Sequence, residues 1–458
     1  MDKSTRTYNK QAMNWDSFVT WLIRPIAGSS HYAPENFWKN ASAEARALAE
    51  KALAPFAHSM APVDYHAHLV GNGVGLNPPA LHKDMLSWRH PLSHIRYLSY
   101  LSALKLPLSR KNPDRHIRQH IHHLVKHIRD PSKVPSRSYR VQMLAVDSYY
   151  TTDGQKKEDS THFYVSNDYL LELVREFPEN FTPVFSVHPF RRDAIEELTR
   201  CHTLFEEWKS HLVTRGIIKS EDSSKIPKML KWLPNSMGID PMNPLCDRFY
   251  DKLREFQFTL LSHAGEELAV TVDRYHQRLG NPLHLRRPIR FGVNVIVAHC
   301  ASLGKNPDFD HDGRLEDNLT LCLRMLKESI ENPKEGDGKL YGDISALGIF
   351  MCQKQLCTIL DTPEIHHRLF NGSDYPIPAI NILVHLWGAK RAGMITAKEA
   401  TSLREIYNYN PLLMDVVFKR TVRHPQSGRQ FPEELFTHVP DSYPSREDQN
   451  HLRQQKLA

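Results

Sequence analysis

Two histidines stand two residues apart where a short apolar run ends, in the segment APVDYHAHL (residues 61–69). Side chains at positions i and i+2 of a β-strand point to the same side, so Asp64, His66 and His68 are expected to share one face. Two imidazoles buried side by side need a partner, and a divalent metal ion suits neutral imidazole. Because such a pair also arises by chance in a chain with 27 histidines, it needs support from elsewhere in the chain.

Three further apolar runs end in a residue that can bind a metal or transfer a proton. They finish at His263 in TLLSHAG, at His299 in VIVAHCA and at Asp374 in LFNGSDYP. Each one alone fits a strand-end histidine bonded to a carbonyl group, or an aspartate that caps the next helix. Together with His66 and His68 they predict a metal centre at one rim of a barrel, where the carboxyl ends of the strands meet.

The segments that must position these side chains alternate between short apolar runs and longer stretches of helical periodicity. Eight runs are expected to be strands: Val63–His68, Tyr139–Val146, Thr182–His188, Lys228–Leu233, Thr259–His263, Val293–His299, Leu340–Ile344 and Arg368–Gly372. The helical stretches between them are Asp168–Phe177, Arg192–Lys209, Cys246–Phe256 and Leu315–Ile330. Strands that alternate with helices indicate an α/β fold with a parallel sheet, and eight such units favour a closed (β/α)8 TIM barrel. No glycine-rich nucleotide-binding loop follows any strand.

Three regions fall outside this repeat. Residues 1–60 are expected to form a helical N-terminal extension, and residues 61–395 to form the barrel. A long insertion after the first strand, residues 71–138, is expected to be helical, since Ile117, Ile121, Leu124, Val125 and Ile128 make one apolar helix face. His116, His120, His123 and His127 lie on or near its other face, as metal ligands or as a solvated surface. Residues 396–458 are expected to hold one clear helix, Pro411–Arg420, and a polar tail that frays.

Composition limits the class of protein. Among the 458 residues, 40% are hydrophobic and 24% are charged, which is a globular balance. The 59 Lys and Arg against 52 Asp and Glu give a net charge of +7, a diffuse excess that permits an anionic substrate but does not indicate nucleic-acid binding. The chain has no run of about 18 apolar residues and no signal peptide, and its six cysteines are scattered, so we expect no membrane span and a cytoplasmic location.

From about Pro62 to Trp387 the sequence resembles the amidohydrolase superfamily, in its amidohydrolase-related branch of metal-dependent TIM-barrel hydrolases. The motifs that carry the resemblance are residues 64–68 (DYHAH), 186–189 (SVHP), 231–241 (KWLPNSMGIDP), 262–267 (SHAGEE), 298–300 (AHC) and 371–376 (NGSDYP). The blocks at 231–241 and 371–376 look like an uncharacterised bacterial subgroup. The resemblance implies that His66, His68, His263 and Asp374 bind a divalent metal, with zinc expected and Mn, Fe or Ni as alternatives. It also implies that Asp374 takes the proton from the bound water and that His299 orients that water.

Lys231 leaves three alternatives open. The resemblance implies that a carboxylated lysine in the fourth strand bridges two metal ions in some members, in which case His263 and His299 would both serve the second ion. Otherwise Lys231 contacts an anionic substrate beside one ion, or it lies on the surface with only its stem buried. His188 and Arg191 are further candidates for binding the substrate, since an arginine can hold a carboxylate with two hydrogen bonds.

The sequence therefore predicts a metal-dependent hydrolase that cleaves an amide, ester or lactone of a small molecule with an activated water. One alternative is a metal-dependent decarboxylase on the same site. A nuclease like the TatD group is disfavoured, because that group carries a glutamate where this chain has Lys231. An inactive barrel that acts as a binding protein is the alternative from another class. A homo-oligomer is compatible with all of these functions.

Overall fold

The computed structural model describes residues 31–56, 63–70, 80–105, 113–130, 132, 139–270 and 272–441. Most of the polar tail predicted beyond residue 440 lies outside the described residues. The helical N-terminal extension is described from residue 31, and the insertion in two pieces that hold its helices.

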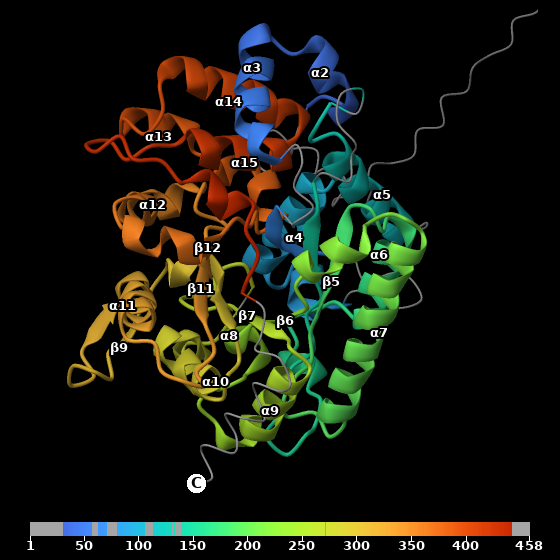
Figure 1. The fold of residues 1–458 in the computed structure, drawn as a ribbon, viewed down its shortest axis with the longest axis vertical. Helices are drawn as coiled ribbons and strands as arrows, with labels where there is room; N and C mark the ends of the chain where they lie inside the picture. The colour runs from blue at the N-terminus through green and yellow to red at the C-terminus, as the bar shows by residue number, and fades with distance from the viewer. Residues whose placement is uncertain are drawn as a thin grey trace, which may run out of the picture.

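Eight parallel strands form one sheet that curls into a barrel (Figure 1). In sheet order they are β1 (Asp64–His68), β3 (Val141–Leu144), β5 (Phe181–Phe185), β6 (Met229–Trp232), β7 (Thr259–Ser262), β8 (Val295–Val297), β11 (Leu340–Asp343) and β12 (Leu369–Phe370). Between the first and last strands, the Tyr65 amide donates to the Asn371 carbonyl over 2.8 Å and the His68 amide donates to the Tyr375 carbonyl over 2.8 Å. Each strand lies within a predicted run or overlaps it, and the predicted (β/α)8 TIM barrel is confirmed.

Each strand contributes a side chain to the interior of the barrel, and Ala298, directly after β8, adds one more. The layer consists of Tyr65, Leu144, Val184, Met229, Leu261, Ile296, Ala298, Tyr341 and Phe370, all of them buried. These side chains exclude water from the barrel interior and contribute hydrophobic stabilisation. The candidate site residues His66, Lys231 and His263 follow the residues of this layer by one or two positions, toward the carboxyl ends of β1, β6 and β7.

Helices pack around the outside of the barrel (Figure 1). They are α6 (Asn167–Glu176), α7 (Ala194–Thr214), α8 (Pro234–Met237), α9 (Asp247–Glu255), α10 (Arg286–Arg290), α11 (Asn318–Glu331), α12 (Gln353–Leu360) and α13 (Leu386–Arg391). Two short antiparallel pairs lie apart from the barrel sheet, β2 (Ala80–Leu81) with β4 (Phe163–Tyr164) and β9 (Lys305–Pro307) with β10 (Leu315–Asp317). The predicted helical stretches become α6, α7, α9 and α11, with the first three residues of the last stretch forming β10.

The N-terminal and C-terminal extensions pack against each other, and the insertion contacts the C-terminal extension through its second helix. The N-terminal extension supplies α2 (Phe37–Asn40) and α3 (Ala43–Leu53), the insertion α4 (Pro91–Ala103) and α5 (Pro113–Lys126), and the C-terminal extension α14 (Ala397–Tyr409) and α15 (Pro411–Thr421). Helix α3 contacts α14 and α15, and α15 contacts α5. The predicted apolar face of α5 is buried as expected.

The C-terminal extension holds two helices, α14 and α15, whereas the sequence predicted one clear helix, Pro411–Arg420. The break falls at Asn410, whose backbone is extended and whose side chain accepts hydrogen bonds from the amides of Leu412 and Leu413 at the start of α15. The same side chain donates to the carbonyl of Leu124 in α5 over 2.8 Å, so it fixes the insertion to the C-terminal extension.

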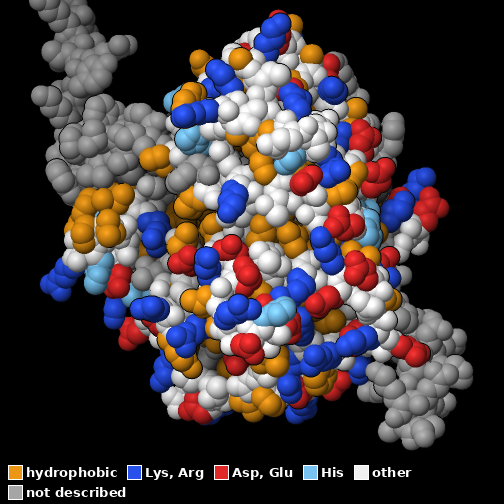
Figure 2. Space-filling model, turned by 90° about the vertical axis from the view of Figure 1, so that its left-hand side faces the viewer, with side chains coloured by type: hydrophobic (Ala, Val, Ile, Leu, Met, Phe, Trp, Pro, Cys, Tyr) orange, Lys and Arg blue, Asp and Glu red, His pale blue; other side chains and the backbone are white. Residues whose placement is uncertain are grey.

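The surface and the cysteines agree with the composition. Figure 2 shows basic and acidic side chains interspersed on the face that carries α11 to α13. None of the described helices combines the length and the apolar character needed to cross a bilayer. All six cysteines lie in the described ranges, and none of them forms a disulfide.

Candidate metal centre

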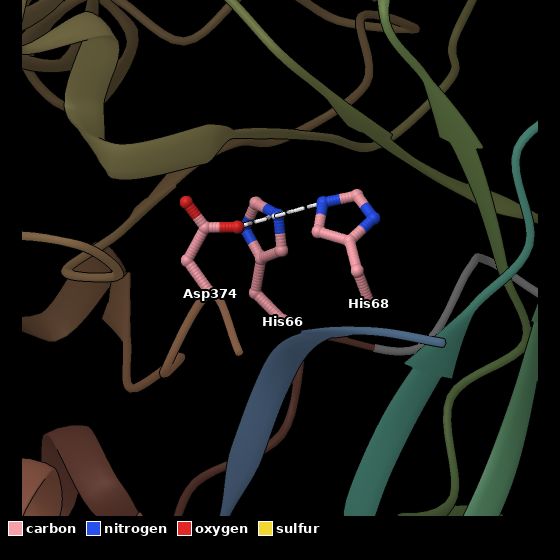
Figure 3. Close-up of side chains that lie close together, drawn as sticks. All are labelled: His66, His68 and Asp374. Carbon is pink, nitrogen blue, oxygen red and sulfur yellow. Dashed lines mark hydrogen bonds and ion pairs between the residues drawn. The ribbon is translucent and has the colours of Figure 1, made fainter. Parts of the chain in front are cut away.

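Three of the predicted ligands meet at the carboxyl ends of the strands. The Nε2 atoms of His66 and His68 are 3.3 Å apart, and Oδ1 of Asp374 lies 3.4 Å from the first and 3.5 Å from the second. Figure 3 shows the two imidazoles and the carboxylate turned toward one another. Among the described residues, these three form the group of mutually close donor atoms that could hold a metal ion.

The distances fit a tetrahedral ion. Bonds of about 2.0–2.1 Å to zinc place ligand atoms at the corners of a tetrahedron roughly 3.3–3.4 Å apart, which matches the three separations found here. The donor set of two imidazoles and one carboxylate is also one that zinc and other transition metals accept. The residues present therefore fit a divalent metal ion.

Asp343 sets the orientation of His66. The Nδ1 atom of His66 donates to Oδ2 of Asp343 over 2.9 Å, and Ser345 Oγ lies 3.1 Å from the same nitrogen. With its proton on Nδ1, the ring presents the lone pair of Nε2 to the cavity, as a metal ligand must. Asp343 ends strand β11 and is fully buried; burial acts to raise its pKa, but the charge and hydrogen bond of His66 outweigh burial and hold that pKa well below its ordinary value.

Asp64 does not share the role of the two histidines. The pairing of β1 with β3 shifts register between Asp64 and Ala67, which is the mark of a β-bulge, and Tyr65 enters the interior layer. Oδ1 of Asp64 instead accepts from the amides of His66 (3.0 Å) and Ser373 (2.9 Å). The expectation that all three side chains share one face is therefore wrong for Asp64, because the bulge interrupts the alternation of the strand.

His263 and His299 form a second pair beside the first group. His299 Nε2 lies 3.0 Å from His263 Nδ1, while His263 Nε2 and His299 Nδ1 are buried without a hydrogen-bond partner in the described part of the chain. Burial, together with the charge of neighbouring groups, lowers the pKa of each imidazole to about 3. Neutral imidazoles with unsatisfied nitrogens suit a metal ion, since ligands must be deprotonated.

The backbone after strand β8 is strained where it carries His299. His299, Cys300 and Ala301 all have positive φ, at 41°, 50° and 53°. Each such residue costs about 1–3 kcal/mol, and strain of this kind clusters at functional sites. The His299 amide donates to Oδ1 of Asp343 over 2.7 Å, so the carboxylate that orients His66 also holds this turn.

Lys231 lies beside His66 and is not a surface residue. It is 1% exposed, and its Nζ atom is 3.1 Å from Nε2 of His66. Burial lowers the pKa of Lys231 to about 8, although nearby carboxylates, Asp374 first, act in the opposite direction. The alternative of an exposed lysine is wrong, because strand β6 directs this side chain into the barrel mouth.

A cavity of about 370 Å³ opens above these side chains. Its floor carries His66, His68, Lys231, His263, His299 and Asp374. Its walls are largely apolar and come from loops after the strands and from the insertion. This is the size and character of a small-molecule site, with a few polar groups converging in an apolar cleft.

The two other predicted substrate contacts lie outside this lining. His188 is buried, donates from Nε2 to the Met237 carbonyl (2.9 Å) and accepts from the Phe190 amide (3.1 Å). Arg191 is paired with Asp147 at 3.1 Å and with Asp193 at 2.8 Å. Their hydrogen bonds account for their positions, and their roles in substrate binding stay predictions. The histidines of α5 form no group of metal donors among the described residues, and His123 pairs with Glu35 over 2.6 Å.

Comparison with solved structures retrieves proteins of low sequence identity, among them the following three. An uncharacterised TIM-barrel protein from Bordetella bronchiseptica is 13% identical, with 78% of this chain and 98% of that chain covered and a TM-score of 0.37. A 5-carboxyvanillate decarboxylase from Novosphingobium aromaticivorans with bound manganese is 13% identical (65% and 76% covered, TM-score 0.30). An amidohydrolase from Burkholderia ambifaria with bound zinc is 8% identical (93% and 94% covered, TM-score 0.35).

The other comparisons return nothing. No family model matches the chain, and no curated protein matches it. With TM-scores below 0.5, the solved structures do not indicate which reaction this chain catalyses.

Proposed function

We propose that this chain is a metal-dependent hydrolase of the amidohydrolase superfamily that cleaves an amide, ester or lactone bond of a small molecule. The observation that carries the proposal is the set of three donor atoms, on His66, His68 and Asp374, that face one point with separations of 3.3–3.5 Å. The hydrogen bond from His66 to Asp343 supports it, because it leaves the Nε2 lone pair directed at that point.

The residues divide the work of hydrolysis between them. His66, His68 and Asp374 would hold the ion, which when bound supplies Lewis acidity and a water of lowered pKa. Asp374 is 17% exposed at the cavity floor, so its carboxylate can accept the proton from the attacking water and return it to the leaving group. With one ion, His299, which borders the same space, can donate a hydrogen bond to the oxygen on which charge develops; with two ions it would hold the second ion.

The number of ions depends on Lys231. In the two-ion alternative, His263 and His299 would both bind the second ion. They would then have to lie close to each other and outside the group of His66, His68 and Asp374, which is how they are arranged. In that case a carboxylated Lys231 would stand between the ions. With one ion, the ammonium group of Lys231 would face an anionic part of the substrate. The separate grouping of the histidines supports the two-ion arrangement, with zinc as the first metal to test.

The proposal is tested by elemental analysis of metal per chain, combined with a screen of esters, lactones, amides and aromatic carboxylic acids. We expect bound divalent metal and hydrolysis that is lost on chelation and restored by Zn or Mn. Release of CO₂ without incorporation of water would replace hydrolysis by decarboxylation. Protein that binds no metal, and that Zn and Mn do not activate, would be a barrel with a binding role only. Because the cysteines are unpaired, we also propose a cytoplasmic location.

A further inference from the structure

One wall of the cavity comes from helix α4, within the insertion that follows the first strand. This helix contributes Arg96, Tyr97, Ser99, Tyr100 and Leu101 to the lining. The hydroxyl of Tyr100 donates to the Ala269 carbonyl over 3.0 Å, so the helix is fastened to the loop after β7. The insertion therefore helps to define which molecules reach the metal centre.

Arg96 is the cationic group of this wall, and it has no anion to pair with. Within the described residues its guanidinium forms no hydrogen bond and no ion pair, although it borders a cavity with mostly apolar walls. Arg96 is partly exposed, and none of its side-chain nitrogens is among the described buried atoms that lack a hydrogen-bond partner, so its five N–H donors are open to a ligand that enters the cavity. A group of this kind in a binding cavity calls for an anionic ligand.

Glu267, a carboxylate on which Arg96 acts, is already engaged by other groups. Arg96 acts electrostatically on Glu267 without contacting it. Oε1 of Glu267 accepts from the amides of Ala269 (2.6 Å) and Val270 (3.3 Å), and Oε2 lies 3.6 Å from Nδ1 of His263. Glu267 is held by its own loop and does not occupy the donors of Arg96.

We infer that Arg96 binds a carboxylate of the substrate, at the end of the molecule remote from the group that reacts at the metal centre. A planar guanidinium matches a carboxylate with two parallel hydrogen bonds, whereas the apolar residues that line much of the same cavity fit an aliphatic or aromatic body. The substrate class is then an organic acid with an apolar body and a second, reactive group. This assignment of the reactive end rests on the proposed function.

Binding can be measured without turnover. The probes are phenylacetate and its uncharged counterpart phenylacetamide, titrated into the full chain as purified and after removal of metal by a chelator. We expect phenylacetate to bind more tightly than phenylacetamide in both forms. Arg96→Met should raise the Kd of phenylacetate about tenfold to hundredfold and leave that of phenylacetamide unchanged. Arg96→Lys should fall between, because it keeps the charge and loses the paired donors.

Arg89→Met is the matched control, since Arg89 is an exposed arginine of the same insertion outside the cavity lining. It should bind both probes as the wild type does. Phenylacetate binding that is unchanged in Arg96→Met, or that requires the metal, would overturn the inference while leaving the proposed function intact. Tighter binding of phenylphosphonate than of phenylacetate would overturn the carboxylate class. Binding that depends on Arg96 in a chain that takes up no metal would support the subsite and contradict the proposed function.

Discussion

The Nδ1 atom of His66 donates a hydrogen bond to Oδ2 of Asp343 over 2.9 Å, and this contact joins two strands that are 277 residues apart in the sequence. The other oxygen of Asp343 accepts from the His299 amide over 2.7 Å. One buried carboxylate thus orients His66, a candidate metal ligand, and holds the backbone of His299.

Removing the charge of Asp343 should weaken metal binding. We expect Asp343→Asn to lower the affinity for Zn about 10-fold to 100-fold, because the Nε2 lone pair of His66 loses its fixed orientation. A competition titration with a chromogenic chelator measures the effect. Ser345→Ala removes a weaker contact to the same nitrogen and should cost less. Equal affinity in Asp343→Asn and the wild type would show that the contact does not tune the site.

Substitution of the ligands should separate activity from folding. His66→Ala and Asp374→Asn should each abolish turnover and retain the barrel, since neither side chain belongs to the interior layer. Binding of a ligand to the native state alone stabilises it, so Zn should raise the Tm of the wild type and have much less effect on either variant. Near-normal activity in either variant would refute the assignment of the metal centre.

The strands and the ligands could be predicted because both depend on local patterns. An apolar run of four to eight residues is a strand signal, and a polar side chain at its end reaches the mouth of a barrel whichever neighbours the strand has. This is why the eight strands, and the meeting of His66, His68 and Asp374 at the mouth of the barrel, could be predicted from the sequence, whereas their role as metal ligands stays a prediction. Asp343 ends a predicted strand as well, in the run LYGDI, so the same signal was present and could have identified it.

Features that depend on distant contacts could not be read from the sequence. The bulge in β1, which prevents Asp64 from sharing one face with His66 and His68, arises from the pairing of this strand with β3. The grouping of His263 with His299 rather than with His66 depends on how three strands converge. Arg96 lies in an insertion without a recognisable motif, and only the packing of α4 over the barrel mouth brings it to the cavity.

The number of metal ions bound per chain should show whether Lys231 is carboxylated. We expect two ions per chain after purification with bicarbonate and Zn present, and one ion in Lys231→Met, which cannot be carboxylated. Lys231→Glu places a carboxylate in the same strand position and should recover part of the second site. His263→Ala should also reduce the content from two ions to one, because it removes a member of the second pair. One ion per chain in the wild type under all conditions would favour the single-ion alternative.

A methyl group at Gly372 should displace His66, because Gly372 packs directly against it. A Cβ at this position would lie 2.7 Å from Cβ of His66 and 3.1 Å from Cβ of Ser345, closer than side chains approach. The Gly372 carbonyl also accepts from Lys419 Nζ over 2.5 Å, so the loop cannot move away easily. We expect Gly372→Ala to lower the free energy of unfolding by about 1–3 kcal/mol and to weaken Zn binding.

Gly348→Ala is the control for this substitution, because a Cβ there would meet its neighbours at 3.5 Å or more. It should change the free energy of unfolding and the Zn affinity little. Urea unfolding and the chelator titration measure both quantities. Equal behaviour of the two alanine variants would show that the approach of Gly372 to His66 is not tight.

The stability of the protein should fall with decreasing pH, in part through His188. Burial lowers the pKa of His188 to about 3, against about 6.5 in the unfolded chain. Between these values the unfolded state binds the additional proton, so the free energy of unfolding decreases as the pH falls below about 6.5. The free energy of unfolding, measured with urea, should fall between pH 7 and pH 5 in the wild type. In His188→Gln this fall should be smaller by about 2 kcal/mol. His211→Gln, at an exposed position of α7, should retain the full decrease. An unchanged difference between the two pH values in His188→Gln would show that His188 takes up its proton without unfolding and is not held neutral by burial.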